Sequence, residues 1–200
     1  MHDDGPYPVT LVIDYPDRQL DKLTSFFRPF TVIPIAMVLA LLSGGGSTYY
    51  MGGGGVLFAA TVLMLLFRRK YPRWWFDWNL ALVRFSVRVS AYLCLLRDEY
   101  PSTDEEQAVH IEIQYPDASK LSSGMPLVKW ILAIPHYIVL SILWVAAAFC
   151  VIVAWFSILF TGRYPRGLFD FVVGVFRWHL RVAAYAFLLV TDDYPPFSME

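Results

Sequence analysis

Two long stretches without any formally charged side chain constrain this sequence most. Residues 29–67 form the first stretch, which has 39 residues, and residues 130–162 form the second, which has 33. A helix that crosses the hydrocarbon core of a bilayer needs about 20 predominantly apolar residues. Hydrophobic residues make up 57% of the chain and charged residues 16%, against about 45–50% and 25% in soluble domains. These observations predict an integral membrane protein and argue against a soluble or a disordered chain.

The net charge of −1 hides a strong segregation of charge along the chain. Residues 98–117 contain seven acidic side chains and no lysine or arginine. Basic side chains instead flank the uncharged stretches: Lys22, Arg28, Arg68, Arg69, Lys70 and Arg73 flank the first, and Lys120, Lys129, Arg163 and Arg166 flank the second. We interpret these flanks as topology determinants, because lysine and arginine accumulate on the cytoplasmic side of membrane proteins. No nucleic-acid partner is expected.

Several sequence blocks occur twice and in the same order, which predicts two tandem copies over residues 1–104 and 105–200. Residues 9–17 (VTLVIDYPD) match 109–117 (VHIEIQYPD), and 28–34 (RPFTVIP) match 129–135 (KWILAIP). Residues 71–77 (YPRWWFD) match 164–170 (YPRGLFD), and an acidic Tyr-Pro closes each copy at 98–101 and 192–195. With these blocks the chain resembles an uncharacterised bacterial membrane family, domain of unknown function 4389. The resemblance covers nearly the whole chain, implies the bacterial inner membrane, and supplies no activity or catalytic residue.

Each copy is predicted to begin with a short strand, at residues 8–14 and 108–114, because apolar and polar residues alternate there before a Tyr-Pro. An extended arm on the lipid headgroups is the alternative. In copy one we predict apolar helices at 27–42 and 54–67, joined by the glycine-rich residues 43–55. In copy two we predict an apolar hairpin over 127–161, turning near 144–148, since one straight helix of 33 residues would measure about 50 Å. A single strongly tilted helix is its alternative.

An arginine-bearing helix follows in each copy, at residues 74–96 and 167–189. Charged side chains fall on one narrow stripe of an otherwise apolar helix: Arg73, Asp77, Arg84 and Arg88 in copy one, and Arg166, Asp170, Arg177 and Arg181 in copy two. We favour helices lying in the membrane interface, because arginines at mid-depth of a spanning helix are costly. The stripes predict either ion pairs between the Asp of one copy and an Arg of the other, or binding of anionic headgroups; transport or catalysis is the third possibility.

Chemical motifs are scarce. The sequence has no P-loop, dinucleotide fingerprint, zinc-protease motif or nucleophile elbow, and we expect no cofactor and no metal. His136 is a candidate intramembrane polar site, although it can also reach the interface from its place near the helix entrance.

The sequence therefore predicts an all-α integral membrane protein of two tandem repeats, with two short strands on the cytoplasmic side. We expect a multi-pass protein of the bacterial inner membrane with cytoplasmic termini. Its expected role is non-enzymatic: an accessory or scaffold subunit that binds anionic membrane lipids and a partner membrane protein or a second copy of itself. A small transporter or channel component with a site at the repeat interface is the alternative, and a membrane enzyme acting on lipid is the third reading.

Overall fold

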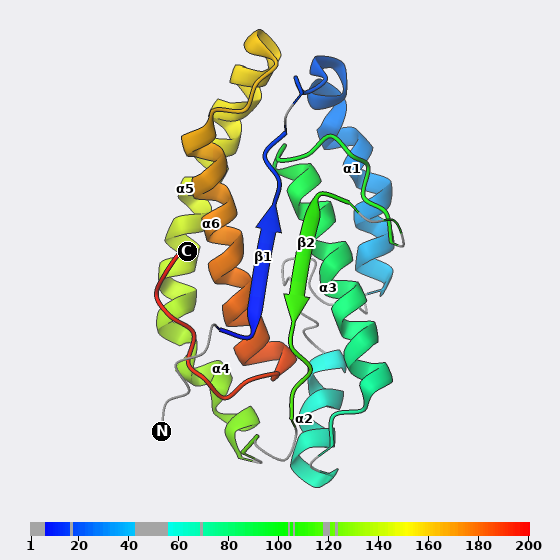
Figure 1. The fold of residues 1–200 in the computed structure, drawn as a ribbon, viewed down its shortest axis with the longest axis vertical. Coiled ribbons are helices and arrows are strands. Elements are labelled where there is room, and N and C mark those ends of the chain that lie inside the picture. The colour runs from blue at the N-terminus through cyan, green and yellow to red at the C-terminus, as the bar shows by residue number, and fades with distance from the viewer. Residues whose placement is uncertain are drawn as a thin grey trace.

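The computed structural model describes residues 7–16, 18–42, 56–68, 70–103, 105, 107–117, 121–122 and 124–200. This part of the chain is mostly helical, with two short strands (Figure 1). The glycine-rich connection predicted at 43–55 lies outside the described residues, as do Arg69 and Lys120. The elements in chain order are β1 (Val9–Ile13), α1 (Lys22–Leu42), α2 (Val56–Arg68), α3 (Arg73–Leu93), β2 (Val109–Ile113), a 3-10 turn η1 (Met125–Leu127), α4 (Lys129–Leu132), α5 (Ile134–Thr161), α6 (Arg166–Ala183) and a π-helical turn η2 (Ala184–Leu188).

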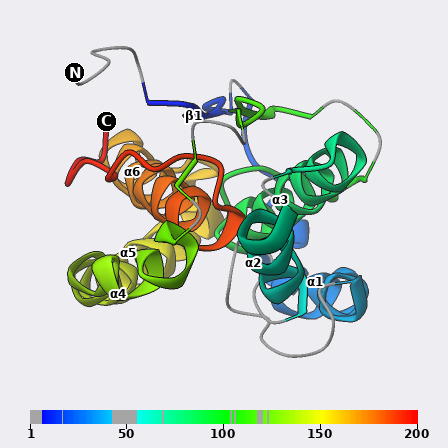
Figure 2. The same ribbon diagram turned by 90° about the horizontal axis from the view of Figure 1, so that it is seen from below.

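The elements form three layers, which are seen end-on in Figure 2. The two strands make one outer layer, α3 and α6 make the middle layer, and α1, α2, α4 and α5 lie on the opposite side. Strand β1 packs on α6 and strand β2 packs on α3, while α1 packs on α3 and α5 packs on α6. Each strand therefore covers the arginine-bearing helix that lies in the other half of the chain.

The strands pair antiparallel, with Leu11 opposite Ile111 at the centre of the register. Both strands alternate buried and exposed side chains, because successive residues of a strand point to opposite faces. Val9, Leu11 and Ile13 of β1 are buried against the helices. The paired strands lie within the predicted ranges 8–14 and 108–114, and they replace the alternative of an extended arm.

The predicted hairpin over 127–161 is wrong, because α5 is one continuous helix of 28 residues. At 1.5 Å per residue it is about 42 Å long. Between Pro135 and Gly162 the sequence contains neither proline nor glycine, so nothing interrupts the backbone hydrogen bonds near the expected turn at 144–148. Gly162, with a φ of 72°, ends the helix in the left-handed conformation that glycine adopts without strain.

The two apolar helices of the first half, α1 and α2, do not form a side-by-side hairpin either. Helix α2 lies beyond the C-terminal end of α1 along the long axis of the molecule, instead of packing beside it (Figure 1). Together, α1 and α2 occupy a place beside α3 that corresponds to the place of α5 beside α6. The Pro29 and Pro34 positions lie inside α1 without ending it.

The middle layer is the most buried part of the structure. Within an 18-residue apolar window of α6 and η2, 72% of the window is buried inside the protein. The corresponding windows of α1 and α5 are each 17% buried. Helix α6 supplies Val172, Val175 and Phe176 to the core, and α3 supplies Val83 and Val87. Gly174 allows the C-terminal segment to approach α6 closely, since a Cβ there would lie 2.9 Å from the Cβ of Met199. The apolar outer layer is therefore α1 and α5, and not the arginine-bearing helices.

Candidate functional site

Arg84 and Arg177, at the middle of the two arginine stripes, bind the strand that covers their helix. The Arg177 Nε donates to the carbonyl oxygen of Leu11 at 2.9 Å. The Arg84 guanidinium donates to the carbonyl oxygen of Ile111 through Nη2 at 3.1 Å and Nε at 3.3 Å. Leu11 and Ile111 are register partners, so the two arginines hold the centre of the sheet. We call these two contacts the sheet clamps.

The remaining arginines of the stripes also contact backbone oxygens or aromatic rings. Arg88 donates to the carbonyl oxygen of Ser102 at 2.8 Å, and Arg181 donates to that of Ser198 at 3.4 Å. The guanidinium carbon of Arg166 lies 4.4 Å from the ring centre of Tyr15, and that of Arg73 lies 5.4 Å from the ring centre of Tyr115. Each of these ring contacts joins a residue of one half to a residue of the other.

The predicted ion pairs between the copies are not formed within the described residues. Asp77 and Asp170 are exposed, and neither makes a salt bridge to an arginine of the stripes in the part of the chain that the structure describes. The sequence could not reveal the true acceptors, because the carbonyls that the sheet clamps bind belong to strands far away in the chain.

Arg28, Tyr92 and Asp98 form a buried polar cluster, the Arg28 cluster, at the end of α3. The Arg28 side chain is only 1% exposed and pairs with the Asp98 carboxylate. Its Nη1 donates to the carbonyl oxygens of Tyr92 at 3.1 Å and of Arg97 at 2.8 Å. The guanidinium carbon lies 4.4 Å from the centre of the Tyr92 ring. The second carboxylate oxygen of Asp98 accepts the backbone N–H of Asp21 at 2.8 Å.

A second cluster of the same design, the Lys129 cluster, contains Lys129, Tyr185 and Asp192. The Lys129 side chain is 1% exposed, and its Nζ lies 2.7 Å from the Asp192 carboxylate and donates to the carbonyl oxygen of Thr191 at 2.6 Å. The Nζ also lies 5.2 Å from the Tyr185 ring centre. Burial lowers the pKa of the Lys129 ammonium, and the hydrogen bond to Asp192 opposes that shift.

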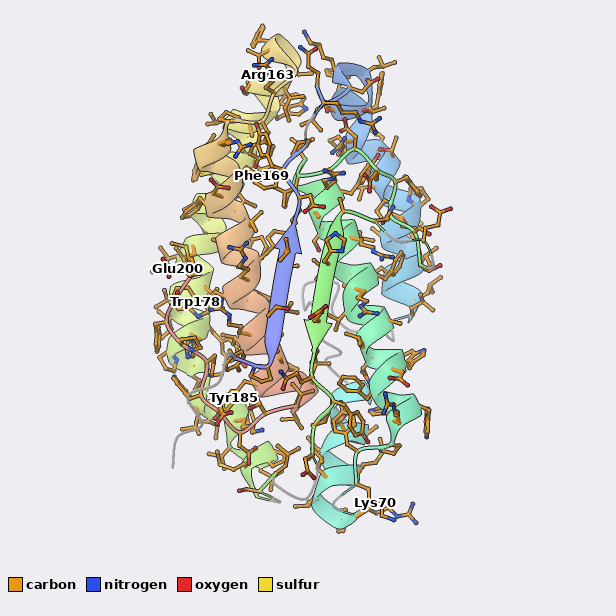
Figure 3. All side chains as sticks on the ribbon, viewed as in Figure 1. Lys70, Arg163, Phe169, Trp178, Tyr185 and Glu200 are labelled. Carbon is orange, nitrogen blue, oxygen red and sulfur yellow. The ribbon has the colours of Figure 1, made fainter. Side chains whose placement is uncertain are left out.

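The two clusters lie at opposite ends of the long axis. The end of α3 is at the upper end of Figure 1, and α4 and the labelled Tyr185 are near the lower end of Figures 1 and 3. Sequence reasoning assigned Arg28 and Lys129 to membrane topology and missed both clusters. The signal was present in the sequence, because each half of the chain contains a basic residue before an Ile-Pro and an acidic residue before a later Tyr-Pro.

A second charge contact lies beside the Arg28 cluster, where Arg97 pairs with Glu99 at 2.6 Å. Burial raises the pKa of Glu99, but the hydrogen bond and positive charge of Arg97 outweigh this effect and lower the pKa below its ordinary value. The connector after α3 is therefore held by charged contacts as well as by apolar packing.

His136 is fully buried near the start of α5. Its Nδ1 accepts the indole N–H of Trp178 at 3.0 Å, and its ring stacks on Phe197 with centroids 3.9 Å apart. The contacts that the structure gives this side chain come from a helix and the C-terminal segment of the same half, and they pack the core. Among the described residues, no group of three or more His, Cys, Asp or Glu side chains could hold a metal ion.

Comparison with known protein families finds a match in the second half of the chain. The sequence model of the family described as Domain of unknown function (DUF4389) matches residues 126–199, which contain α4, α5, α6 and η2. No curated protein and no solved structure matches the chain. The family resemblance is therefore shown for the second half, and for the first half it stays a prediction. In the part of the chain that the structure describes, three segments are long and apolar enough to cross a membrane: α1, α5 and residues Arg166–Leu188.

The sheet clamps yield a first prediction. Arg177→Ala is expected to lower the free energy of unfolding by about 1.5–3 kcal/mol, because hydrogen bonds from charged groups are worth about that much. Arg84→Ala should cost less, since its contacts to Ile111 are longer. Thermal unfolding in mild detergent measures the loss, and amide hydrogen exchange should accelerate at Asp14, whose backbone N–H donates to Ala108 of the paired strand. Unchanged melting together with unchanged co-purified lipid in both variants would contradict both a structural and a lipid-binding role.

Proposed function

We propose that this protein is a non-enzymatic scaffold of the bacterial inner membrane, built from two tandem copies, that binds anionic lipid and presents a polar sheet to a partner membrane protein. The observation that carries the proposal is the separation of an apolar outer face from a charged outer face. The residues that match the family of unknown function include α5 and Arg166–Leu188, which are long and apolar enough to cross a membrane. This supports the membrane part of the proposal.

The tandem-copy part of the proposal is supported by contacts that occur in matching pairs. The sheet clamps bind the two register partners at the centre of the sheet. The Arg28 and Lys129 clusters use corresponding positions of the two sequence copies. The Tyr15 hydroxyl donates to the carbonyl oxygen of Tyr164, and the Tyr115 hydroxyl donates to that of Tyr71. These pairs are what a two-fold axis between the strands would produce.

The apolar outer face is formed by α1 and α5. Its large side chains are 44–81% exposed, which is far more apolar surface than a soluble monomer leaves in one patch. Acyl chains are the environment in which such a face is stable. The residues of this apolar face are Phe26, Phe27, Phe30, Ile33, Met37, Val38 and Leu41 of α1 and Ile138, Ile142, Val145, Phe149, Ile152, Val153, Phe156 and Phe160 of α5.

The opposite face is polar. The exposed face of the sheet carries Asp14, His110 and Glu112, and the His110 Nε2 lies 3.3 Å from the Asp14 carboxylate. The strands run along the same axis as the helices (Figure 1). If the helices crossed the bilayer, the sheet with its free edges would lie at the depth of the hydrocarbon, where unpaired backbone groups are not tolerated.

We therefore favour a placement with the long axis in the plane of the membrane. The apolar layer is one helix thick, about 10–12 Å, and fits within one leaflet of a core about 30 Å thick. The sheet then faces water on the cytoplasmic side, as do the basic residues at both ends of the molecule. A spanning α5 would instead place Lys129 and Arg163 on opposite sides, against the positive-inside rule. The prediction of a multi-pass chain assumed apolar hairpins, whereas the structure has the single helix α5 where the hairpin over 127–161 was expected.

The partner-binding part of the proposal depends on the sheet. The sheet clamps already occupy the central carbonyl of each outer edge, so the surface offered to a partner is the exposed face with the charged side chains of Asp14 and Glu112. The transporter alternative has less support, because His136 is packed against aromatic rings and the contact between α6 and the rest of the core is lined by apolar side chains such as Val172 and Phe176.

Cysteine labelling tests the placement. In a Cys94→Ala, Cys150→Ala background, single cysteines at Thr10, Lys70 and Arg163 are each expected to react with an impermeant maleimide from the cytoplasmic side only. Lys70 and Arg163 lie at opposite ends of the molecule (Figure 3). A cysteine at Phe149, on the apolar face, serves as the control that should stay unlabelled. Reaction of the Lys70 and Arg163 positions from opposite sides of the membrane would refute the in-plane placement.

A further inference from the structure

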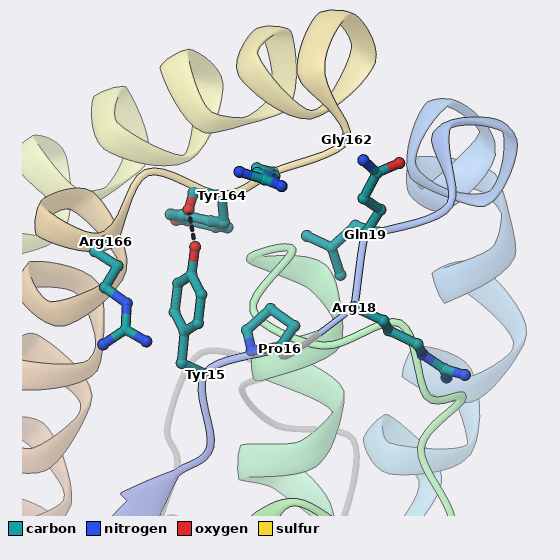
Figure 4. A pocket seen from close by; sticks show the side chains of 9 residues that line it. Tyr15, Pro16, Arg18, Gln19, Gly162, Tyr164 and Arg166 are labelled. Carbon is teal, nitrogen blue, oxygen red and sulfur yellow. Dashed lines mark hydrogen bonds between the residues drawn. The ribbon is translucent and has the colours of Figure 1, made fainter.

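A cationic pocket lies where the segment after β1 meets the connection between α5 and α6 (Figure 4). It is at the end of the molecule opposite the Lys129 cluster, because Arg163, which lines it, is at the upper end of Figure 3 and Tyr185 is near the lower end. It has a volume of about 330 Å³. Its walls come from the segment after β1 and from the connection between α5 and α6. The lining residues are Tyr15, Pro16, Arg18, Gln19, Leu20, Gly162, Arg163, Tyr164 and Arg166.

Three of the lining residues are arginines, and none of the lining residues that the structure describes is a carboxylate; Asp17, between Pro16 and Arg18, lies outside the described residues. Arg18, Arg163 and Arg166 are exposed, and no salt bridge neutralises any of their guanidinium groups within the described ranges. Arg166 and Arg18 lie on opposite sides of the cavity and their side chains extend away from each other (Figure 4). An anion in the cavity is attracted by the positive charges of all three arginines. Guanidinium groups match phosphate oxygens in geometry as well as in charge.

The pocket is held in shape by contacts between the two halves. The Tyr15 hydroxyl donates to the carbonyl oxygen of Tyr164, and the Arg166 guanidinium lies over the Tyr15 ring, 4.4 Å from its centre. The backbone N–H of Leu20 donates to the carbonyl oxygen of Gly162 at 2.9 Å. These contacts fix one arginine and both walls before any ligand binds, which reduces the conformational entropy that binding must offset.

The pocket lies next to exposed apolar side chains, which favours an anion that carries an apolar chain. The last turn of α5 leads directly into its wall, and that turn carries Phe160, which is 79% exposed and belongs to the apolar face. The Lys22 Nζ donates to the carbonyl oxygen of Phe160 at 3.1 Å, which places another cation beside the same turn. A ligand with a phosphate next to an apolar chain would satisfy both surfaces at once.

We propose that this pocket binds the phosphate of an anionic phospholipid, whose acyl chains lie along the exposed face of α5. The inference rests on the proposed membrane function, which it deepens by naming a lipid site. It moves the headgroup contact from the sheet clamps, which already bind strand carbonyls, to Arg18, Arg163 and Arg166.

Binding of short-chain lipids to the purified full-length protein tests the site. Native mass spectrometry in mild detergent would compare dioctanoyl phosphatidylglycerol, dioctanoyl phosphatidylcholine and inorganic phosphate as ligands. We expect the Arg163→Gln, Arg166→Gln double variant to bind phosphatidylglycerol about tenfold more weakly than the wild type. The matched control, Arg68→Gln with Lys70→Gln, removes the same charge at the other end of the molecule and should bind like the wild type.

Two outcomes overturn the inference, each in a distinct way. Equal losses in the two double variants would mean a non-specific effect of net charge. Inorganic phosphate that binds as tightly as phosphatidylglycerol would mean a site for a soluble anion. Circular dichroism and thermal unfolding of each variant identify a loss that comes from misfolding; in that case Arg18→Gln, which removes a pocket charge outside the helices, repeats the test. The proposed membrane function fails separately, if the wild-type protein does not float with vesicles of phosphatidylcholine alone.

Discussion

Replacing Asp98 with alanine is expected to lower the free energy of unfolding by about 3–5 kcal/mol, because it leaves a buried guanidinium without its counter-ion. The Arg28 side chain is 1% exposed and that of Asp98 is 16% exposed, so water cannot replace the carboxylate in full. The carbonyl acceptors of Tyr92 and Arg97 remain, but they carry no net charge. An arginine also cannot escape the penalty by losing its proton. Chemical unfolding in mild detergent measures the loss.

Two further variants separate the charge effect from a general loss of packing. Arg28→Met combined with Asp98→Ala removes both charges while retaining a long side chain, and it should recover the larger part of the lost stability. Glu112→Ala removes an exposed carboxylate from the sheet and should stay within about 0.5 kcal/mol of the wild type. A double variant as unstable as Asp98→Ala would show that the Arg28 cluster does not act through its ion pair.

The same substitution at the Lys129 cluster is expected to cost less. Asp192 is 25% exposed, so water reaches this pair more easily. Lys129 can also release its proton, and burial already lowers its pKa. Stability lost in Asp192→Ala should therefore shrink as the pH rises through the lowered pKa of Lys129, because the unpaired ammonium is then converted to the neutral amine.

Local pattern in the sequence predicted much of the local structure. Alternation at 8–14 and 108–114 located both strands, and the apolar period after each Tyr-Pro-Arg located α3 and α6. The hairpin over 127–161 was predicted from the length of the apolar stretch and from the positive charges at its two ends. It does not form, because the sequence contains no proline or glycine between Pro135 and Gly162 that would end the helix. The in-plane placement now meets the same charge rule without a turn in α5.

Contacts between distant segments were beyond sequence reasoning. The sequence placed Arg177 on a polar stripe, and in the structure its acceptor is the carbonyl oxygen of Leu11, 166 residues away. A backbone carbonyl leaves no trace in the sequence, so carboxylates were expected instead. Arg28 and Lys129 were expected at the ends of membrane helices, whereas the fold buries both and pairs them with Asp98 and Asp192, each in the same half of the chain as its partner.

Because each strand packs on the arginine-bearing helix of the other half, we expect the folding of each half to depend on the other. Strand β1 buries Val9, Leu11 and Ile13 on α6, which belongs to the other half, and each such side chain contributes about 1.5–3 kcal/mol when it leaves water. A half expressed alone lacks the strand that covers its arginine-bearing helix, and its clamp arginine lacks a carbonyl acceptor. Neither half should therefore fold as a monomer.

We expect residues 1–104 and 105–200, produced together as separate chains, to co-purify in a one-to-one complex, while each half alone aggregates or is degraded. Leu11→Asp in the first half should abolish co-purification, because Leu11 is 4% exposed and faces α6. Val12→Asp, at a position that is 48% exposed on the outer face of the same strand, should leave it unchanged. A monomeric, cooperatively unfolding 105–200 chain would show that the second half supplies its own core. A homodimer of that chain would instead extend the prediction, since β2 of each copy could then cover α6 of the other.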